Sequence, residues 1–177
     1  MSEPLVFTAS YESLARALGP KLDPSAKAKF RAHGVDFDRP LQSAYPLTTW
    51  VQSLEVACEL LLPGRPRDEQ TYLVGRRIVL GFAETMVGKA LFALLRIQGP
   101  HRGLMRMARN LRMSNNYSES SLEKTGVGYR LWVNKVNFPH YYRGVFEAGL
   151  ESVGAKDIAV KLLQHDAAGA SFDITFR

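Results

Sequence analysis

An apolar stretch with helical spacing, Thr71–Ile97, constrains the fold of this 177-residue chain more than any other feature. Its second half places apolar residues three or four positions apart, as one face of a helix does. These residues are Ala83, Met86, Val87, Ala90, Leu91, Leu94 and Leu95. A membrane span needs about 20 apolar residues, whereas charged residues such as Arg76, Glu84 and Lys89 interrupt this run. The stretch therefore predicts a central core helix, or two consecutive helices.

Length and composition favour a single domain over residues 1–177. Hydrophobic residues make up 46% of the chain, which is enough to build a core. Cys58 is the only cysteine, so an internal disulfide is excluded. The beginning, Met1–Pro4, lacks the basic and apolar regions of a signal peptide. We therefore expect a cytoplasmic protein.

The formal net charge is +6 and the sequence pI is about 9.6. Such a balance raises the question of nucleic-acid binding. The basic residues are spread along the chain, and neither a Lys/Arg-rich block nor a nucleic-acid-binding motif is present. The charge pattern therefore disfavours a nucleic-acid partner and is typical of a mildly basic globular protein.

The pattern of apolar residues changes near residue 114. Before it, apolar residues recur mostly at helical spacing, and Gly-Pro or Pro-Gly pairs separate the segments. After it, the segments 127–134 and 172–177 alternate between apolar and polar residues, as strands do. The order becomes strand, strand, helix (142–153), strand, strand. We therefore predict an α+β fold, with a helical N-terminal half (1–114) packed on a four-stranded antiparallel sheet (115–177).

Three arginines share one face of the helix predicted over 101–113. Arg102, Arg106 and Arg109 stand at positions i, i+4 and i+7. Guanidinium groups suit carboxylate and phosphate oxygens, so the face is a candidate contact for an anion or an acidic partner. The alternative is an ordinary solvated face of an amphipathic helix.

Motifs of catalysis are missing from the sequence. It contains no glycine-rich phosphate loop, no paired histidines at metal spacing and no Gly-x-Ser-x-Gly. His140 stands beside Tyr141 and Tyr142, but neighbouring residues point in different directions on a helix, and no carboxylate is placed to orient the ring. We therefore expect neither an enzyme nor a metal site.

Several motifs carry a resemblance to a known family. The run YRLWVNKVNFPHYYRGVFEAGLESVGAKDIAVKL, with RNLRMSNNYSE before it and AYPLTTW further upstream, resembles a myxobacteria-restricted family of unknown function. At a coarser level the chain is similar to the superfamily of haem-nitric-oxide-binding domains, 4-vinyl reductase domains and TRAPP vesicle-tethering subunits. That resemblance implies a helical half followed by a four-stranded sheet, and binding of haem, small hydrophobic molecules, acyl chains or proteins.

The residues depart from the haem-binding members. Those members use a histidine on a helix and a Tyr-x-Ser-x-Arg motif before the last helix. Counting back from Gly144 puts the motif near Leu131–Lys135, where none of its three residues is present. His101 is the only histidine near the corresponding helices. We therefore expect no haem and no other cofactor.

Two functions remain open. The leading one is a non-enzymatic regulatory or scaffold domain that binds a protein partner. The alternative is a sensor for a small hydrophobic ligand, held in a pocket between helices and sheet. Its lining would include the aromatic residues Phe82, Phe92, Trp132 and Phe146. The length of the apolar stretch and the resemblance to the superfamily also predict a homodimer.

Overall fold

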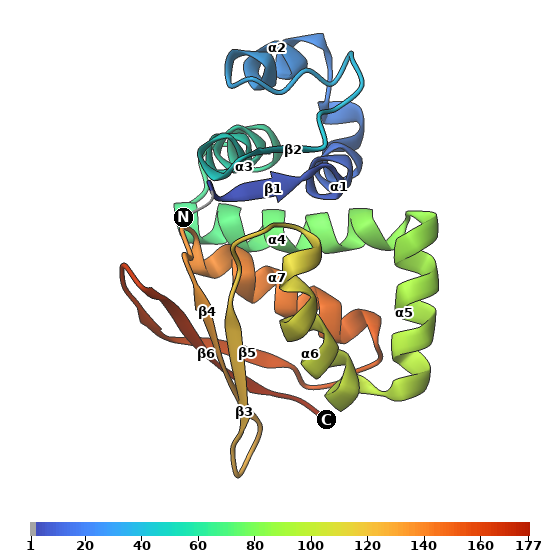
Figure 1. The fold of residues 1–177 in the computed structure, drawn as a ribbon, viewed down its shortest axis with the longest axis vertical. Coiled ribbons are helices and arrows are strands. Elements are labelled where there is room, and N and C mark those ends of the chain that lie inside the picture. The colour runs from blue at the N-terminus through green and yellow to red at the C-terminus, as the bar shows by residue number, and fades with distance from the viewer. Residues whose placement is uncertain (1–2) are drawn as a thin grey trace.

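The computed structural model describes residues 3–177 and has the predicted α+β architecture. Figure 1 shows an N-terminal helical layer, a long central helix beneath it, and a twisted sheet covered by helices on one face. The N-terminal layer contains the strands β1 (Leu5–Phe7) and β2 (Ala44–Pro46), which pair with each other. Its helices are α1 (Thr8–Leu18), α2 (Pro24–Ala32) and α3 (Leu47–Leu61).

The predicted central stretch forms two consecutive helices, α4 (Arg67–Ala83) and α5 (Met86–Gln98). They are bent by 96° relative to each other. Thr85 caps the N-terminus of the second helix, because its hydroxyl accepts a hydrogen bond from the Gly88 backbone N–H at 2.9 Å. Among residues 3–177 no single helix is long and apolar enough to cross a membrane, although this bent pair meets the criterion by length and composition.

Helix α4 lies between the N-terminal layer and α7 (Pro139–Ser152). The close approach to α7 depends on two glycines. A Cβ atom at Gly75 would lie 2.2 Å from the carbonyl oxygen of Tyr141, and one at Gly144 would lie 2.0 Å from that of Tyr72. Both glycines are therefore required by the packing of one helix backbone on the other.

The C-terminal sheet is antiparallel with the order β3-β4-β6-β5. Its strands are β3 (Ser120–Lys124), β4 (Tyr129–Asn134), β5 (Ala159–His165) and β6 (Gly169–Thr175). Helix α7 follows β4 in the chain, which gives the predicted order of elements. It covers one face of the sheet together with α6 (Pro100–Arg109), and a 3₁₀ turn at Asn110–Met113 continues α6.

Two main clusters form the core. One lies in the N-terminal layer and includes the fully buried rings of Tyr11 and Phe30. The other fills the space between the sheet and its helices and includes Leu131, Phe146 and Phe172, each with no exposed surface. Cys58 is also buried, and burial raises the pKa of its thiol to about 11, as expected for an inert core cysteine.

Candidate functional site

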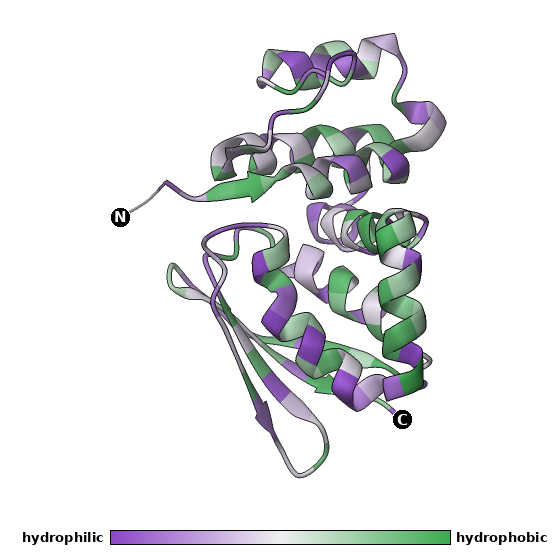
Figure 2. Ribbon diagram, turned by 45° about the vertical axis from the view of Figure 1, so that its right-hand side comes forward, coloured by the Kyte–Doolittle hydropathy of each residue, from purple (hydrophilic) through white to green (hydrophobic). Residues whose placement is uncertain are grey.

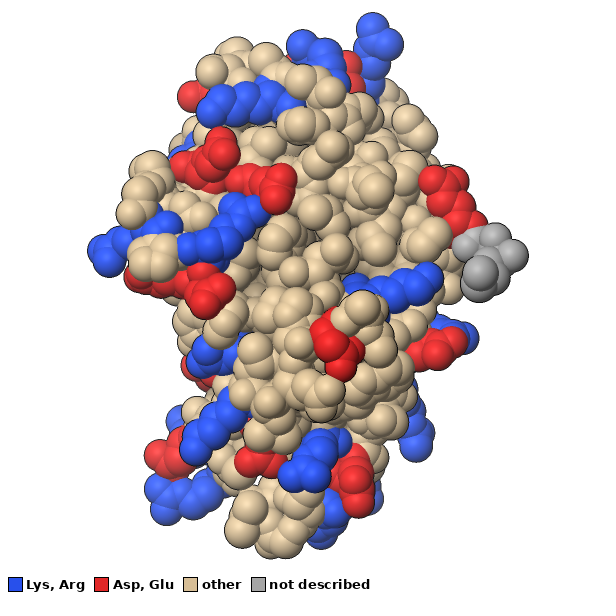
Figure 3. Space-filling model, turned by 90° about the vertical axis from the view of Figure 1, so that its left-hand side faces the viewer, with Lys and Arg blue, Asp and Glu red and all other residues tan. Residues whose placement is uncertain are grey.

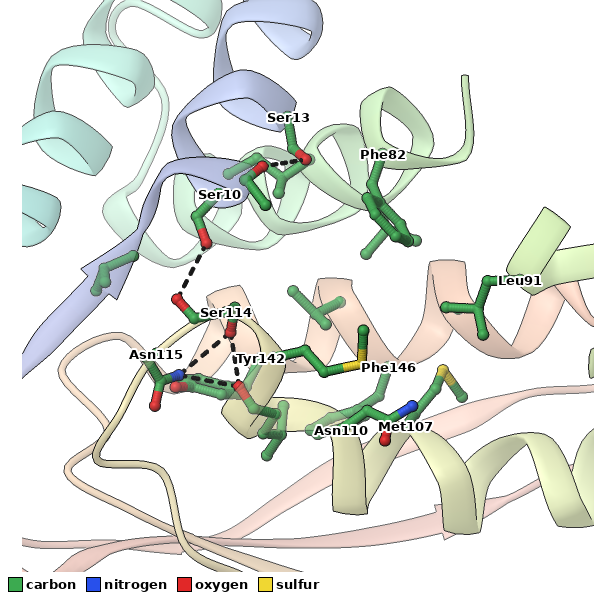
Figure 4. A pocket seen from close by; sticks show the side chains of 18 of the residues that line it. Ser10, Ser13, Phe82, Leu91, Met107, Asn110, Ser114, Asn115, Tyr142 and Phe146 are labelled. Carbon is green, nitrogen blue, oxygen red and sulfur yellow. Dashed lines mark hydrogen bonds between the residues drawn. The ribbon is translucent and has the colours of Figure 1, made fainter. Parts of the chain in front are cut away.

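A cavity of about 300 Å³ lies between the N-terminal layer and the C-terminal half. Figure 4 shows side chains from both halves pointing into it. Helix α1 contributes Ser10 and Ser13, α4 contributes Phe82, and α5 contributes Leu91. The remaining lining residues are Val6, Ala9, Trp50, Ile78, Val79, Val87, Phe92, Leu95, Met107, Asn110, Leu111, Met113, Ser114, Asn115, Tyr117, Tyr141, Tyr142, Val145, Phe146 and Gly149.

Among residues 3–177, the lining carries no Asp, Glu, Lys, Arg or His side chain. The titratable groups of the lining are the phenols of Tyr117, Tyr141 and Tyr142. Burial raises the pKa of Tyr142 to about 12 and also raises the pKa values of Tyr117 and Tyr141. The cavity wall is therefore electrically neutral at physiological pH.

The serine side chains of the lining and Asn115 already take part in hydrogen bonds within the protein. The Ser13 hydroxyl donates to the Ala9 carbonyl at 2.8 Å, and the Ser114 hydroxyl donates to the Leu111 carbonyl at 2.7 Å. The side-chain amide of Asn115 donates to the same Leu111 carbonyl at 3.1 Å (Figure 4). These four side chains are therefore engaged within the protein, and most of the other lining residues are apolar, so the wall presents mainly apolar surface to a ligand.

One end of the cavity is closed by contacts between the two halves. The Phe7 N–H donates to the Ser114 carbonyl at 2.8 Å, and the Leu5 N–H donates to the Asn116 side-chain oxygen at 2.8 Å. Elsewhere, Ala9, Val87 and Met113 line the cavity and are also exposed to solvent. From this combination we infer that the cavity opens to solvent beside these three residues, from α1, α5 and the 3₁₀ turn after α6, and we call them its mouth.

The structure brings together three of the four predicted aromatic residues. Phe82, Phe92 and Phe146 line the cavity, and the rings of Phe82 and Phe92 lie 6.2 Å apart in an edge-on arrangement. Trp132 does not line it. This residue lies on the opposite side of β4 from Leu131 and Val133, which are fully buried against the helices.

Sequence reasoning missed several lining residues. Ser10, Ser13, Ser114 and Asn115 come from segments that are far apart in the sequence, and the strand pairing near Val6 brings them together. Trp50 also lines the cavity and is 7% exposed. The sequence indicated that Trp50 lies on the apolar side of a helix. Such periodicity predicts that a residue is buried, but it does not predict which element the residue packs against.

The three arginines lie away from the cavity wall. Arg102, Arg106 and Arg109 are exposed on α6, and none of them has an ion pair within residues 3–177. The adjacent residues Met107, on α6, and Asn110, in the 3₁₀ turn after it, do line the cavity. The arginine face therefore lies next to the side of α6 that lines the cavity.

The histidines have structural neighbours. His101 Nδ1 lies 2.9 Å from the Tyr129 hydroxyl, outside the cavity. His140 Nε2 lies 3.3 Å from a carboxylate oxygen of Asp68, and its Nδ1 lies 3.0 Å from Arg143. The expectation that no carboxylate orients His140 was therefore wrong, because Asp68 reaches it from α4. Within residues 3–177 no group of three or more His, Cys, Asp or Glu side chains is placed to hold a metal ion.

The model of a protein of unknown function, DUF2378, matches residues 4–176. The chain belongs to the DUF2378 family. No curated protein matches the sequence. The family match covers almost the whole chain, as the resemblance of its motifs had indicated, and it brings no known activity with it.

The structure of this DUF2378 chain is similar to solved H-NOX structures. An H-NOX protein from S. oneidensis in the Fe(II) ligation state is 10% identical, with a TM-score of 0.71 and coverage of 97% of this chain and 96% of that one. An oxygen-binding H-NOX domain related to soluble guanylate cyclases is 16% identical, with a TM-score of 0.67 and coverage of 96% and 92%. An unliganded Fe(II) H-NOX mutant from K. algicida is 13% identical, with a TM-score of 0.64 and coverage of 96% and 95%. At this identity the likeness establishes the fold alone.

Within residues 3–177 the cavity lacks the histidine or cysteine ligand and the basic side chains that would favour haem. Haem iron in proteins takes His, Cys, Met or Tyr as an axial ligand. Among residues 3–177 the lining contains neither His nor Cys, so its candidate ligands are the thioethers of Met107 and Met113 and the tyrosine phenols. The raised pKa values of the lining tyrosines disfavour the phenolate that an iron ligand requires. Haem propionates are anionic, and among residues 3–177 the lining offers no Lys or Arg to pair with them.

Proposed function

We propose that this chain is a non-enzymatic regulatory domain that binds a small, uncharged, apolar molecule in the cavity between its two halves. The observation that carries the proposal is a cavity of about 300 Å³ whose lining has no charged side chain. This volume is at the lower end of the range of small-molecule sites. An uncharged wall penalises a charged ligand, because a buried charge without a partner is costly.

The position of the cavity supports a regulatory role. Its wall is assembled from α1, α4, α5, the end of α6 and α7, so a ligand would contact both halves of the fold at once. Binding stabilises whichever arrangement of these elements fits the ligand. Helix α5 is the element best suited to respond, because it places only Val87, Leu91, Phe92 and Leu95 against the cavity and leaves much of its other surface exposed.

The proposal can be tested with N-phenyl-1-naphthylamine, a neutral probe that fluoresces in apolar sites. The background is the Trp132→Phe variant, which leaves Trp50 in the cavity wall as the only tryptophan. We expect probe emission on excitation of Trp50. Val145→Phe should remove most of this emission by filling the cavity, whereas Leu163→Phe, on an exposed strand position, should not.

The melting temperature of each variant is measured first, because a larger core residue can strain the fold. Leu91→Phe fills the cavity from the opposite wall if Val145→Phe does not fold. Equal probe emission from the filled variants and the Leu163→Phe control would contradict binding in the cavity. Native mass spectrometry of the gently purified protein then gives the mass of any retained natural ligand.

A second candidate is the protein-binding scaffold that the sequence favoured. It is supported by exposed apolar side chains on α5, where Met86 is 88% and Ile97 is 86% exposed. A partner purified with an otherwise empty protein would favour this function over the sensor. The two candidates are compatible where ligand binding changes the exposed side of α5.

A further inference from the structure

The excess positive charge of the chain lies in one segment. Between Glu84 and Glu119 there is no acidic residue, and the six basic residues there are Lys89, Arg96, Arg102, Arg106, Arg109 and Arg112. The whole chain has 23 Lys and Arg against 17 Asp and Glu. The rest of the chain contains 17 basic and 17 acidic residues, so it is formally neutral.

The structure leaves most of this charge unneutralised. All six side chains are exposed, and Arg112 is the one paired with a carboxylate, at 3.6 Å from Glu119, within residues 3–177. Arg96 donates to the Ser152 carbonyl at 2.6 Å, which leaves its charge in place. By contrast, the face in Figure 3, turned away from α5, has basic and acidic side chains interspersed.

The same segment exposes much of the protein's large apolar surface. Its exposed apolar side chains are Met86, Val87, Leu94, Ile97, Met105 and Met113. Along α5, the residues Met86, Ala90, Leu94 and Ile97 are exposed and follow one another at helical spacing. We call these four residues the α5 stripe. Figure 2 shows α5, largely hydrophobic, beside α6, which carries repeated hydrophilic residues, on the same side of the molecule.

We propose that the α5 stripe and the arginine face of α6 together dock on the surface of an anionic lipid bilayer. A helix that lies in the membrane interface combines exposed apolar side chains with Lys and Arg and lacks acids, as this surface does. Each basic residue near an anionic bilayer contributes to attraction, and exposed apolar side chains enter the boundary between headgroups and acyl chains.

The position of the cavity mouth is a second observation that favours a lipid bilayer as the partner of this surface. Val87 and Met113 belong both to the exposed apolar side chains of the segment and to the cavity lining. On a docked protein the mouth would therefore open close to the bilayer, from which an apolar molecule could enter without crossing water. Docking itself does not depend on cavity binding, so the two proposals can fail independently.

A second copy of the chain is the less favourable occupant. Pairing this face with itself would oppose six positive charges with six more, at a cost that only screening by salt reduces. An acidic protein partner satisfies the charge but makes no use of the cavity mouth. Binding to vesicles distinguishes a bilayer from a second copy of the chain and from an acidic protein.

The test is co-sedimentation of the full chain with vesicles of phosphatidylcholine alone or mixed with phosphatidylglycerol. We expect sedimentation with the mixed vesicles only, and its loss as salt is raised. The triple variant Arg102→Gln, Arg106→Gln, Arg109→Gln should reduce the bound fraction at least about tenfold. The matched control is Lys29→Gln, Lys124→Gln, Lys156→Gln, which removes the same charge from exposed sites elsewhere and should bind nearly as the parent does.

The apolar contribution has its own pair of variants. Met86→Ser with Ile97→Ser should weaken sedimentation, whereas Val127→Ser with Leu163→Ser, which alter exposed residues outside the segment, should not. The proposal is overturned if the folded parent stays in solution with phosphatidylglycerol vesicles at low salt, as it would if this face binds only a protein. It is equally overturned if both charge variants lose binding to the same extent, because net charge alone would then explain it.

Discussion

At the scale of the residue, the tyrosines of the cavity wall link its neutrality to stability. The pKa of Tyr142 is raised to about 12 by burial, above the ordinary value of 10.0 that it has when unfolded. The neutral phenol is therefore favoured by folding. Its contribution is complete below pH 10 and is lost as the pH rises toward about 12.

We therefore expect the free energy of unfolding to fall steeply above pH 10, with Tyr117 and Tyr141 acting in the same direction. Urea unfolding at a series of pH values measures this slope. The Tyr142→Phe variant keeps the ring and cannot ionise, so its slope should be shallower than that of the parent. Parallel slopes for the two proteins would show that Tyr142 does not titrate in the folded state as described.

Individual residues also show where sequence reasoning succeeds and where it stops. Alternation in β4 was visible in the sequence and puts Trp132 on the same side as Arg130, opposite Leu131 and Val133. Choosing Trp132 for a pocket gave weight to its aromatic ring over its position in the strand. Phe82, Phe92 and Phe146 line the cavity because they lie on helix faces that pack inward. Phe92 was chosen for its aromatic ring, since it lies outside the set of apolar residues that helical spacing selects in this stretch.

At the scale of the element, the helical spacing of apolar residues predicted helix α5, but it did not predict which side of that helix is buried. Helical periodicity identifies a stripe, and Met86, Val87 and Leu94 belong to it in the sequence. They are 88%, 64% and 43% exposed, because the bend after α4 turns α5 away from the N-terminal layer. A bend between helices depends on tertiary packing, which a local pattern does not contain. The absence of Asp and Glu from residues 85–118 was also visible in the sequence, and it indicated that the surface formed by this segment is positively charged.

The close crossing of α4 and α7 predicts that a side chain added at Gly144 destabilises the fold. Gly144→Ala would place a Cβ atom 2.0 Å from the Tyr72 carbonyl oxygen, so the helix backbones must separate. We expect a loss of stability of about 2 kcal/mol or more, as for other strained core substitutions. Gly126→Ala is the control, since nothing lies within 4 Å of a Cβ there. Thermal unfolding compares the two, and a similarly small shift for both would contradict the close crossing.

At the scale of the whole molecule, a fold similar to that of H-NOX structures over nearly the full length contains a cavity whose lining, among residues 3–177, has neither His nor Cys. We expect protein purified from cells supplied with haem to be colourless, without a Soret band. A Soret band that survives purification would contradict this, and its loss on Met107→Ala would identify a thioether ligand from the cavity wall.

The last prediction concerns self-association. The sequence predicts a homodimer, and the α5 stripe is the apolar surface that such a dimer would use. Because the face around it carries unneutralised positive charge, pairing two copies combines apolar attraction with like-charge repulsion. Raising salt from about 0.1 M to about 1 M shortens the Debye length from about 10 Å to about 3 Å, which weakens the repulsion. We therefore expect the dimer to tighten with salt, whereas docking on an anionic bilayer weakens.

Sedimentation equilibrium at the two salt concentrations measures this difference. The monomer has a mass of 19.8 kDa, so the dimer is well separated from it. Met86→Ser with Ile97→Ser should abolish association at both salts, and Val127→Ser with Leu163→Ser should leave it intact. A protein that remains monomeric at micromolar concentrations in high salt, or a dimer that weakens as salt is added, would rule out pairing through the α5 stripe. The opposite salt dependence of the two associations thus shows which of them occupies this face under given conditions.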